Sequence, residues 1–535
     1  MKGFSKSDYI LFFLVFAALV WIFLVLPPLS LCSNDEGAKY VQMKNFYLYK
    51  SLAIEYPGQQ LGFGFEYLLK QQGPFAQRGD KLHCTYPPLF TYLSSLFYPL
   101  LGDRVTHFLP LLAFFLSLIL LSRTLKFLTQ NTFLYYLLLF AFLLGSPIFI
   151  YAFTFWEHLP AVFLVVCSLY FLVRYFYVNA SKLNLFLSAF IISLASLFRT
   201  EVLFLVFSYT VSFGLILAQR RQIREMAALL AGGAVPLTAY VIFNLFYYQH
   251  PWVHILYHSP NFQFSFKKSL LLAGIILSGI ALAFIYKRDQ LDSFLKTKFY
   301  SFVPILWLWV VIVLFEQSPI VSLILSFPAI LLMFFGISER IERRKDKEMT
   351  LGNVILGTVV VFICLEAYFL FHNPDLTVRY CLPVIPFAII FMAAEHERIF
   401  VGKPIYGVLI GFLLFSLIYG LYNFKNDIWR YKWYNWKRIE FLQKYTMVGD
   451  VVIFQNNRLM EHGGPLFFDR IYLVSDRPDE LTKIFNLLKD RGVIHCYFWT
   501  FDSDSFSQKW NSKTIRSDFQ TPGFPPYYLF KVFIE

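Results

Sequence analysis

Long apolar runs constrain this chain more than any other feature of its sequence. Many segments of about 20 residues carry few or no charged side chains, and that is the length an α-helix needs to cross a bilayer. Lipid leaves backbone polar groups without partners, so a spanning segment must be a helix or part of a closed barrel. The runs lack the alternation of barrel strands. We therefore predict an all-α polytopic membrane bundle.

The positions of the runs predict about thirteen transmembrane helices. Basic residues cluster in every second short loop, a pattern that places those loops and the N-terminus in the cytoplasm. An odd number of spans then puts the C-terminal tail outside, which we interpret as the periplasm of a bacterium with this protein in its inner membrane. The expected spans are residues 9–31, 105–121, 133–151, 159–177, 183–198, 202–218, 226–247, 270–286, 299–315, 320–337, 351–371, 381–394 and 405–421.

The net charge of +13 does not indicate a nucleic-acid-binding protein. Its basic residues are distributed among the short cytoplasmic loops and are not gathered into one patch, so they orient the protein in the membrane. We therefore expect the protein to be surrounded by membrane lipids and not to bind nucleic acid.

The hydropathy of the chain predicts two domains. Residues 1–422 form a transmembrane module whose first external loop, 32–103, is much longer than the other loops between spans, and long ordered loops are usually functional. Residues 423–535 are more polar and alternate short β-type runs, at 451–455, 471–475, 493–500 and 527–534, with a helical stretch at 479–491. This tail is expected to be a small soluble extracytoplasmic α/β domain.

Polar residues gather at the outward ends of the expected spans. An acidic pair, Asp35 and Glu36, stands in LCSNDEGAKY where the first span ends, and a second polar segment, HCTYPPLFT, closes the first loop. Charges at the edge of a membrane bundle are costly and usually mark a substrate site, although each alone could be a snorkelling or solvated side chain. The further members of the set are His83, Tyr86, Glu157, His158, Arg199, Glu201, Arg379 and Tyr380.

Histidine and cysteine patterns leave two questions open. His250, His254 and His258 have the spacing of one helical face and could bind a metal, but Pro251 interrupts the segment and no carboxylate completes the set. Interfacial histidines are the alternative interpretation, and no metal or other cofactor follows from the sequence. Cys32 and Cys84 flank the first loop, where a disulfide is chemically permitted.

These motifs resemble the GT-C glycosyltransferases, and among them glycosyltransferase family 39, which includes protein O-mannosyltransferases and lipid A aminoarabinose transferases. The resemblance rests on the acidic pair after the first span, the long loop closing in a PPL segment, and RYCLPVIPF from Arg379 to Phe387. It covers the membrane part and, weakly, the tail. One departure stands out. Aminoarabinose transferases have Glu-Lys before the proline, where this chain has Thr85 and Tyr86.

The resemblance implies transfer of a sugar from a polyprenyl-phosphate donor to an acceptor hydroxyl of a lipid, glycan or protein, with inversion at the sugar carbon. Asp35 would be the general base, and Glu36 would orient the acceptor or a neighbouring side chain. A lipid phosphate leaves as a stable anion, so no acid is needed. The negative charge of this phosphate is stabilised best by guanidinium groups. Arg379 and Arg199 are the candidates for this role.

Other residues receive supporting roles under the same resemblance. Tyr380 accompanies Arg379, and Tyr86 or His83 would donate a hydrogen bond to the donor phosphate. Glu157, His158 and Glu201 would assist the acceptor or a cation, so a requirement for a divalent metal stays open.

Two other functions remain compatible with the sequence. A transporter or flippase of lipid-linked sugars would need a lipid groove but no base, and an oligosaccharide polymerase or ligase would use closely related chemistry. The acidic pair at the end of the first span favours an enzyme over a flippase.

Overall fold

The computed structural model describes residues 3–68, 74–250, 327–331, 333, 350–369, 378–396, 403–455, 463–475, 477–500, 512–516 and 528–534. The chain forms two compact units, and each is described by itself. The first unit comprises Met1–Phe16, Leu111–Ala152 and Glu157–Tyr422, and the second comprises Ala17–Pro110, Phe153–Trp156 and Asn423–Glu535.

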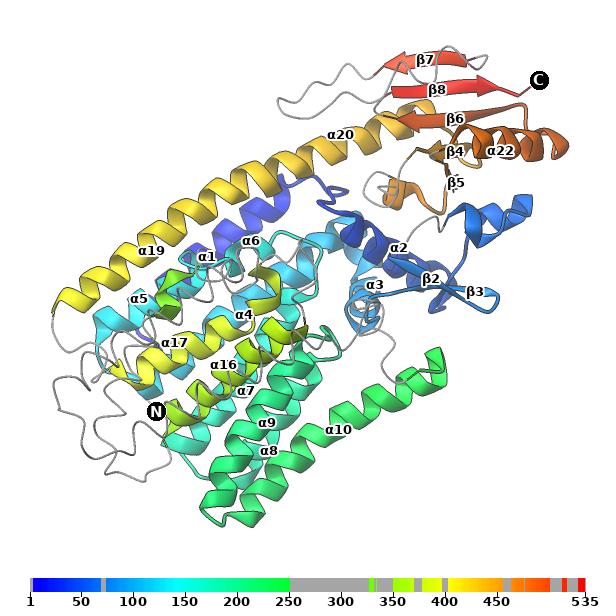
Figure 1. Ribbon diagram of the computed structural model, residues 1–535. Helices are drawn as coiled ribbons and strands as arrows, with labels where there is room; N and C mark the ends of the chain where they lie inside the picture. Colours follow the sequence, from blue (N-terminus) through cyan, green and yellow to red (C-terminus); the bar gives the residue numbers. More distant parts are fainter. Residues whose placement is uncertain are drawn as a thin grey trace, which may run out of the picture. The chain divides into compact units, whose positions relative to one another are not determined.

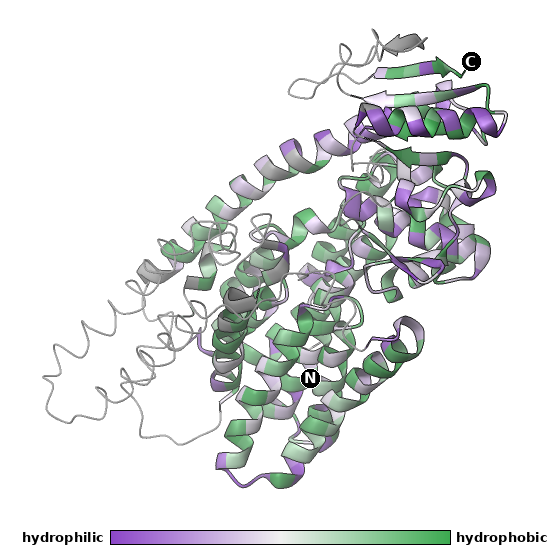
Figure 2. Cartoon of the chain, turned by 45° about the vertical axis from the view of Figure 1, so that its right-hand side comes forward, coloured by the Kyte–Doolittle hydropathy of each residue, from purple (hydrophilic) through white to green (hydrophobic). Residues whose placement is uncertain are grey.

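The first unit is a bundle of helices that consist mostly of hydrophobic residues (Figure 2). Helix α8 packs against α7 and α10, and α9 packs against α16 (Figure 1). Its helices are α5 (Thr132–Leu143), α6 (Ile148–Tyr151), α7 (His158–Tyr177), α8 (Lys182–Ala195), α9 (Val202–Gln219), α10 (Ile223–Tyr248), α16 (Leu351–Phe369), α17 (Val384–Ala394) and α19 (Lys403–Asn423). Helices α1 (Lys6–Val25) and α4 (Val105–Leu128) belong to both units.

Six helical segments among the described residues are long and apolar enough to cross a membrane, so the prediction of an integral membrane protein is confirmed. They are Lys6–Val25, Leu89–Leu128, His158–Tyr177, Val202–Gln219, Ile223–Tyr248 and Tyr406–Tyr445. The count of thirteen is not confirmed. The expected spans 270–286 and 299–315, and most of 320–337, lie outside the described residues.

Proline and glycine explain two helix ends that differ from the expected spans. Helix α1 ends at Val25, before Pro27 and Pro28, because proline lacks the backbone N–H of a helix interior and restricts the residue before it. The expected span 133–151 is divided between α5 and α6, with Gly145 and Pro147 in the connection.

The second unit contains the end of α1 and the long loop that follows it. Helix α2 (Asn34–Tyr49) precedes a three-stranded antiparallel sheet in the order β1 (Ala53–Ile54), β3 (Lys81–Cys84), β2 (Phe75–Arg78). Helix α3 (Leu89–Leu101) begins after Pro87 and Pro88. It joins α4 through a short 3-10 turn, Gly102–Arg104.

The C-terminal part of this unit contains a five-stranded mixed sheet in the order β5-β4-β6-β8-β7. Strand β4 (Val451–Phe454) pairs in parallel with β5 (Ile471–Val474) and β6 (His495–Thr500), while β8 (Tyr528–Phe533) runs antiparallel to β6 and to β7 (Ser512–Arg516). Helix α22 (Pro478–Asp490) precedes β6. Before the sheet, a π-helical turn, Phe424–Trp429, leads into α20 (Arg430–Tyr445).

The first loop and the tail share one hydrophobic core. Val41 of α2, Phe63 and Phe75 belong to the same buried cluster as Phe467 and Trp499 of the tail. Two glycines permit close packing here, since a Cβ on Gly464 would lie 3.2 Å from the Cα of Gly37 in α2. The sequence analysis divided the chain at residue 422, whereas the compact unit joins the loop 32–103 to residues 423–535.

Candidate active site

The acidic pair lies in the first turn of α2. Ser33 is the N-cap in extended geometry, and its hydroxyl accepts a hydrogen bond from the backbone N–H of Glu36 at 3.3 Å. A serine cap followed by carboxylates is a favourable helix start, because the caps and charges satisfy the exposed N–H groups and the helix dipole. The sequence SNDE therefore fixes both the start of α2 and the position of the pair.

The two carboxylates of the pair have different surroundings. Asp35 is partly exposed, whereas Glu36 is fully buried. The Glu36 carboxylate accepts a hydrogen bond from Cys32 N at 2.8 Å and lies 3.8 Å from the ammonium of Lys432. Burial raises the pKa of the Glu36 carboxyl, and the positive charges of Lys432 and Lys39 partly oppose this effect. Of the two, Asp35 is the more accessible to a substrate.

Lys39, one turn after Asp35 in α2, is a feature that the sequence analysis missed. Its side chain is buried, and its ammonium lies over the ring of Tyr86 at 4.3 Å and near that of Trp156 at 5.9 Å. Cation–π contacts stabilise a desolvated cation. The spacing of four residues from Asp35 on a helix could have indicated that Lys39 shares its face.

His83 occupies the central strand of the small sheet. It lies on β3, opposite Ala53 of β1 and Ala76 of β2, and is buried. Burial, and then the charges of Arg78 and Lys81, lower the pKa of the His83 imidazole. Tyr86 follows this strand and is also buried.

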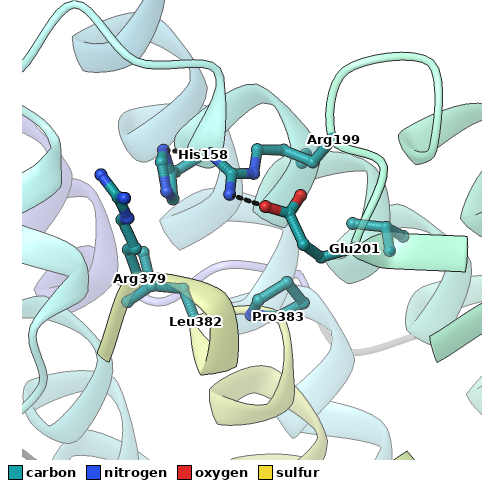
Figure 3. A pocket seen from close by; sticks show the side chains of 8 residues that line it. His158, Arg199, Glu201, Arg379, Leu382 and Pro383 are labelled. Atoms are coloured by element: carbon teal, nitrogen blue, oxygen red, sulfur yellow. Dashed lines mark hydrogen bonds and ion pairs between the residues drawn. The ribbon is translucent and has the colours of Figure 1, made fainter. Parts of the chain in front are cut away.

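A pocket in the first unit contains most of the remaining candidate residues. Its lining includes His158 at the start of α7, Arg199 and Glu201 between α8 and α9, and Arg379 before α17 (Figure 3). Ala161, Val202, Leu382 and Pro383 supply its apolar surface. These positions are helix ends, where the sequence changes from apolar runs to the polar motifs described above.

Arg199 contacts several neighbouring polar side chains. Its guanidinium donates a hydrogen bond to Glu157 at 2.9 Å and forms an ion pair with Glu201. The same group lies 3.4 Å from Nδ1 of His158. All of these side chains are largely buried, so the two carboxylates fix the plane of the guanidinium.

Arg379 lies in the short 3-10 turn Val378–Cys381 and is partly buried. Its side chain extends beside His158 in the pocket (Figure 3). His158 also stacks on the ring of Tyr151, with ring centres 5.1 Å apart. The side chain of Tyr380, the neighbour expected to assist Arg379, lies outside the described residues.

The structure brings Glu157, His158, Arg199, Glu201 and Arg379 together. The other candidates, Asp35, Glu36, His83 and Tyr86, all belong to the second unit.

The described residues contain no cluster of three or more histidine, cysteine or acidic side chains that could hold a metal ion. His250 is described, but His254 and His258 of the same motif are not. Cys32 and Cys84, which are both described, are not joined by a disulfide.

Comparison with solved structures identifies related folds. ArnT from Cupriavidus metallidurans bound to undecaprenyl phosphate aligns with a TM-score of 0.53 and 13% identity, covering 98% of each chain. An oligosaccharyltransferase from Archaeoglobus fulgidus in its apo form aligns with a TM-score of 0.49 and 12% identity, covering 91% of this chain and 69% of its own. Only the first likeness supports the fold assignment below.

The sequence itself matches no protein-family model and no curated protein. The likeness to ArnT extends over nearly the whole length of both chains. The chain therefore has the same overall fold as ArnT.

Proposed function

We propose that this protein is an inverting glycosyltransferase that moves a sugar from a polyprenyl-phosphate donor to an acceptor hydroxyl at the external face of the membrane. The fold supports this class of reaction, because ArnT, with the same fold, was solved with undecaprenyl phosphate. The acceptor is a lipid, a glycan or a protein.

The proposed reaction needs one base and one anion-binding site. The acceptor oxygen attacks the anomeric carbon of the sugar, the bond from that carbon to the phosphate oxygen breaks, and the lipid phosphate leaves with the electron pair. The Asp35 carboxylate takes the acceptor proton as the new bond forms. No acid is required at the leaving oxygen, because the phosphate carries the charge without protonation.

The observation that carries the proposal is the pocket lined by both Arg199 and Arg379. Phosphate oxygens are bound best by guanidinium groups in fixed planes. Glu157 and Glu201 hold Arg199 in such a plane. Arg379, in the short turn before α17, supplies a second guanidinium, and we assign it the main contact with the donor phosphate.

The decisive experiment measures transfer of labelled sugar from polyprenyl-phosphate donors by the purified full-length protein in lipid nanodiscs. Asp35→Asn keeps the size of the side chain and removes the base, and we expect transfer to fall by about 10²–10⁴-fold. Asp80→Asn is a matched control, since Asp80 is an exposed residue of the same loop.

Arg379→Met tests the phosphate site in the same assay, with Arg224→Met, an exposed arginine at the start of α10, as its control. We expect Arg379→Met to weaken binding of undecaprenyl phosphate by at least tenfold while the control binds normally. Equal transfer by wild type and Asp35→Asn would reject the proposed base. Movement of lipid-linked sugar across the bilayer without transfer would instead identify a flippase.

A further inference from the structure

The segment between α1 and α2 is held by side chains from distant parts of the second unit. Helix α1 ends at Val25, so the carbonyl groups of its last turn lack helical partners. Arg104 donates to the carbonyl of Phe23 at 2.7 Å, and Nε2 of His107 lies 3.2 Å from the carbonyl of Pro27. These contacts come from the 3-10 turn before α4 and from α4 itself.

Helix α20 supplies the contacts nearest to the acidic pair. Lys432 donates to the carbonyl of Ser30 at 2.7 Å, and Nδ2 of Asn435 donates to the carbonyl of Leu31 at 2.6 Å. Arg438 donates to Oδ1 of Asn435 at 3.1 Å and thereby orients the amide. The three α20 side chains are almost completely buried, an unusual environment for Lys and Arg.

The same ammonium of Lys432 lies 3.8 Å from the buried carboxylate of Glu36. Lys432 therefore contacts the chain at both ends of residues 31–35, at Ser30 before them and at Glu36 after them. Asp35 belongs to this short segment. We propose that Lys432 is a positioning residue that acts through Glu36 and Ser30 to hold Asp35 in place, and this inference rests on the role proposed above for Asp35.

The charges around Glu36 explain why Lys432 matters for the proposed base, Asp35. Among the described residues, the ionisable groups that face the segment include Lys39 of α2, Lys432 and Arg438 of α20, His107 of α4, and Arg104. Lys432 forms an ion pair with Glu36. Without it, the buried carboxyl of Glu36 would lose its main counter-charge and would hold its own proton to higher pH, which changes the contacts that fix the segment carrying Asp35.

The test compares Lys432→Met, Glu36→Gln and the double variant Glu36→Gln/Lys432→Met with wild type in the transfer assay. We expect kcat of Lys432→Met to fall by about 10²-fold, and the acid limb of its pH profile to move to higher pH. The double variant removes the unpaired carboxylate. It should regain activity over Lys432→Met, and its acid limb should return towards that of wild type.

Lys437→Met is the matched control on the same helix, because Lys437 is only partly buried and pairs with Glu440, away from Glu36. It should behave as wild type. If Lys432→Met does not fold, the double variant alone decides, since without the unpaired carboxylate it should fold and retain activity well above the background of Asp35→Asn. A folded Lys432→Met with wild-type kcat and pH profile would overturn the inference. A double variant no more active than a folded Lys432→Met would also overturn it. If Lys432→Met does not fold, the inference fails when the double variant is no more active than Asp35→Asn.

Asp35→Asn in the same series separates the two proposals. If that variant transfers sugar normally, the proposed base is wrong. If Asp35→Asn is inactive while Lys432→Met matches wild type, only the positioning role of Lys432 is wrong.

Discussion

The hydroxyl of Tyr56 donates a hydrogen bond to the backbone carbonyl of Tyr472 at 2.7 Å, joining the first loop to the edge strand of the C-terminal sheet. Both residues are buried, and their rings belong to the core that the loop and the tail share. The contact spans 416 positions of the sequence, so it reports directly on the packing of the two segments.

Tyr56→Phe removes this hydrogen bond and leaves a buried carbonyl without its donor. We expect a loss of about 1 kcal/mol of stability, seen as a lower thermal unfolding midpoint of the purified protein. Tyr49→Phe is the control, because Tyr49 is 49% exposed. An unchanged midpoint for Tyr56→Phe would mean that the loop and the tail are not coupled through this contact.

Asp8 and Lys126 form an ion pair that joins the start of α1 to the end of α4. Tyr135 of α5 donates a second hydrogen bond to Asp8 at 2.8 Å. Breaking a buried pair leaves the other charge uncompensated, so Asp8→Asn should lower stability by about 3 kcal/mol. Asp8→Asn/Lys126→Met should be less destabilised than the sum of the single variants, and thermal unfolding measures all three.

Arg199→Lys tests whether the planar guanidinium is required in the pocket. A lysine ammonium cannot hold Glu157 and Glu201 and present a fixed pair of donors at the same time. We expect the affinity for undecaprenyl phosphate to fall roughly tenfold, or about 1.4 kcal/mol, with the protein still folded. A titration that gives wild-type affinity would remove Arg199 from the phosphate site.

His83 predicts a pH dependence of stability. Its pKa in the folded protein is lowered from 6.5 by burial and by Arg78 and Lys81, so below about pH 6.5 the unfolded chain binds a proton that the folded chain does not. Stability should therefore fall as the pH decreases through that range. His83→Gln should flatten this part of the curve of unfolding midpoint against pH, and an equally steep curve would contradict the assignment.

The regular elements of the fold could be predicted because their signals are local. Apolar runs without charge indicated helices such as α7 and α9, and β-type runs indicated β4, β5, β6 and β8 of the tail. Strands β1, β2 and β3 were missed because they contain only two to four residues, too few for a periodic pattern. The helical tail segment α20 was missed because its face towards the core carries Lys432 and Asn435, which sequence patterns assign to solvent.

The candidate site could be predicted only in part for a related reason. Arg199, Glu157 and Glu201 were recognisable as charges between apolar runs, and the structure brings them together. The contact of Lys432 with Glu36 joins residues almost four hundred positions apart, and no local pattern reports such a pairing. The ring of Tyr86 under Lys39 is equally invisible in the sequence.

The shared core of the loop and the tail has a consequence for synthesis of the protein. Phe63 and Phe75 are translated early, whereas their core partners Phe467 and Trp499 emerge from the ribosome much later. Until then, the apolar surface of the first loop lacks the tail residues that cover it in the folded protein. Nascent chains are therefore prone to aggregate and to bind chaperones. Chains truncated before Phe467 should therefore be degraded, and the second unit can mature only after these tail segments have been made.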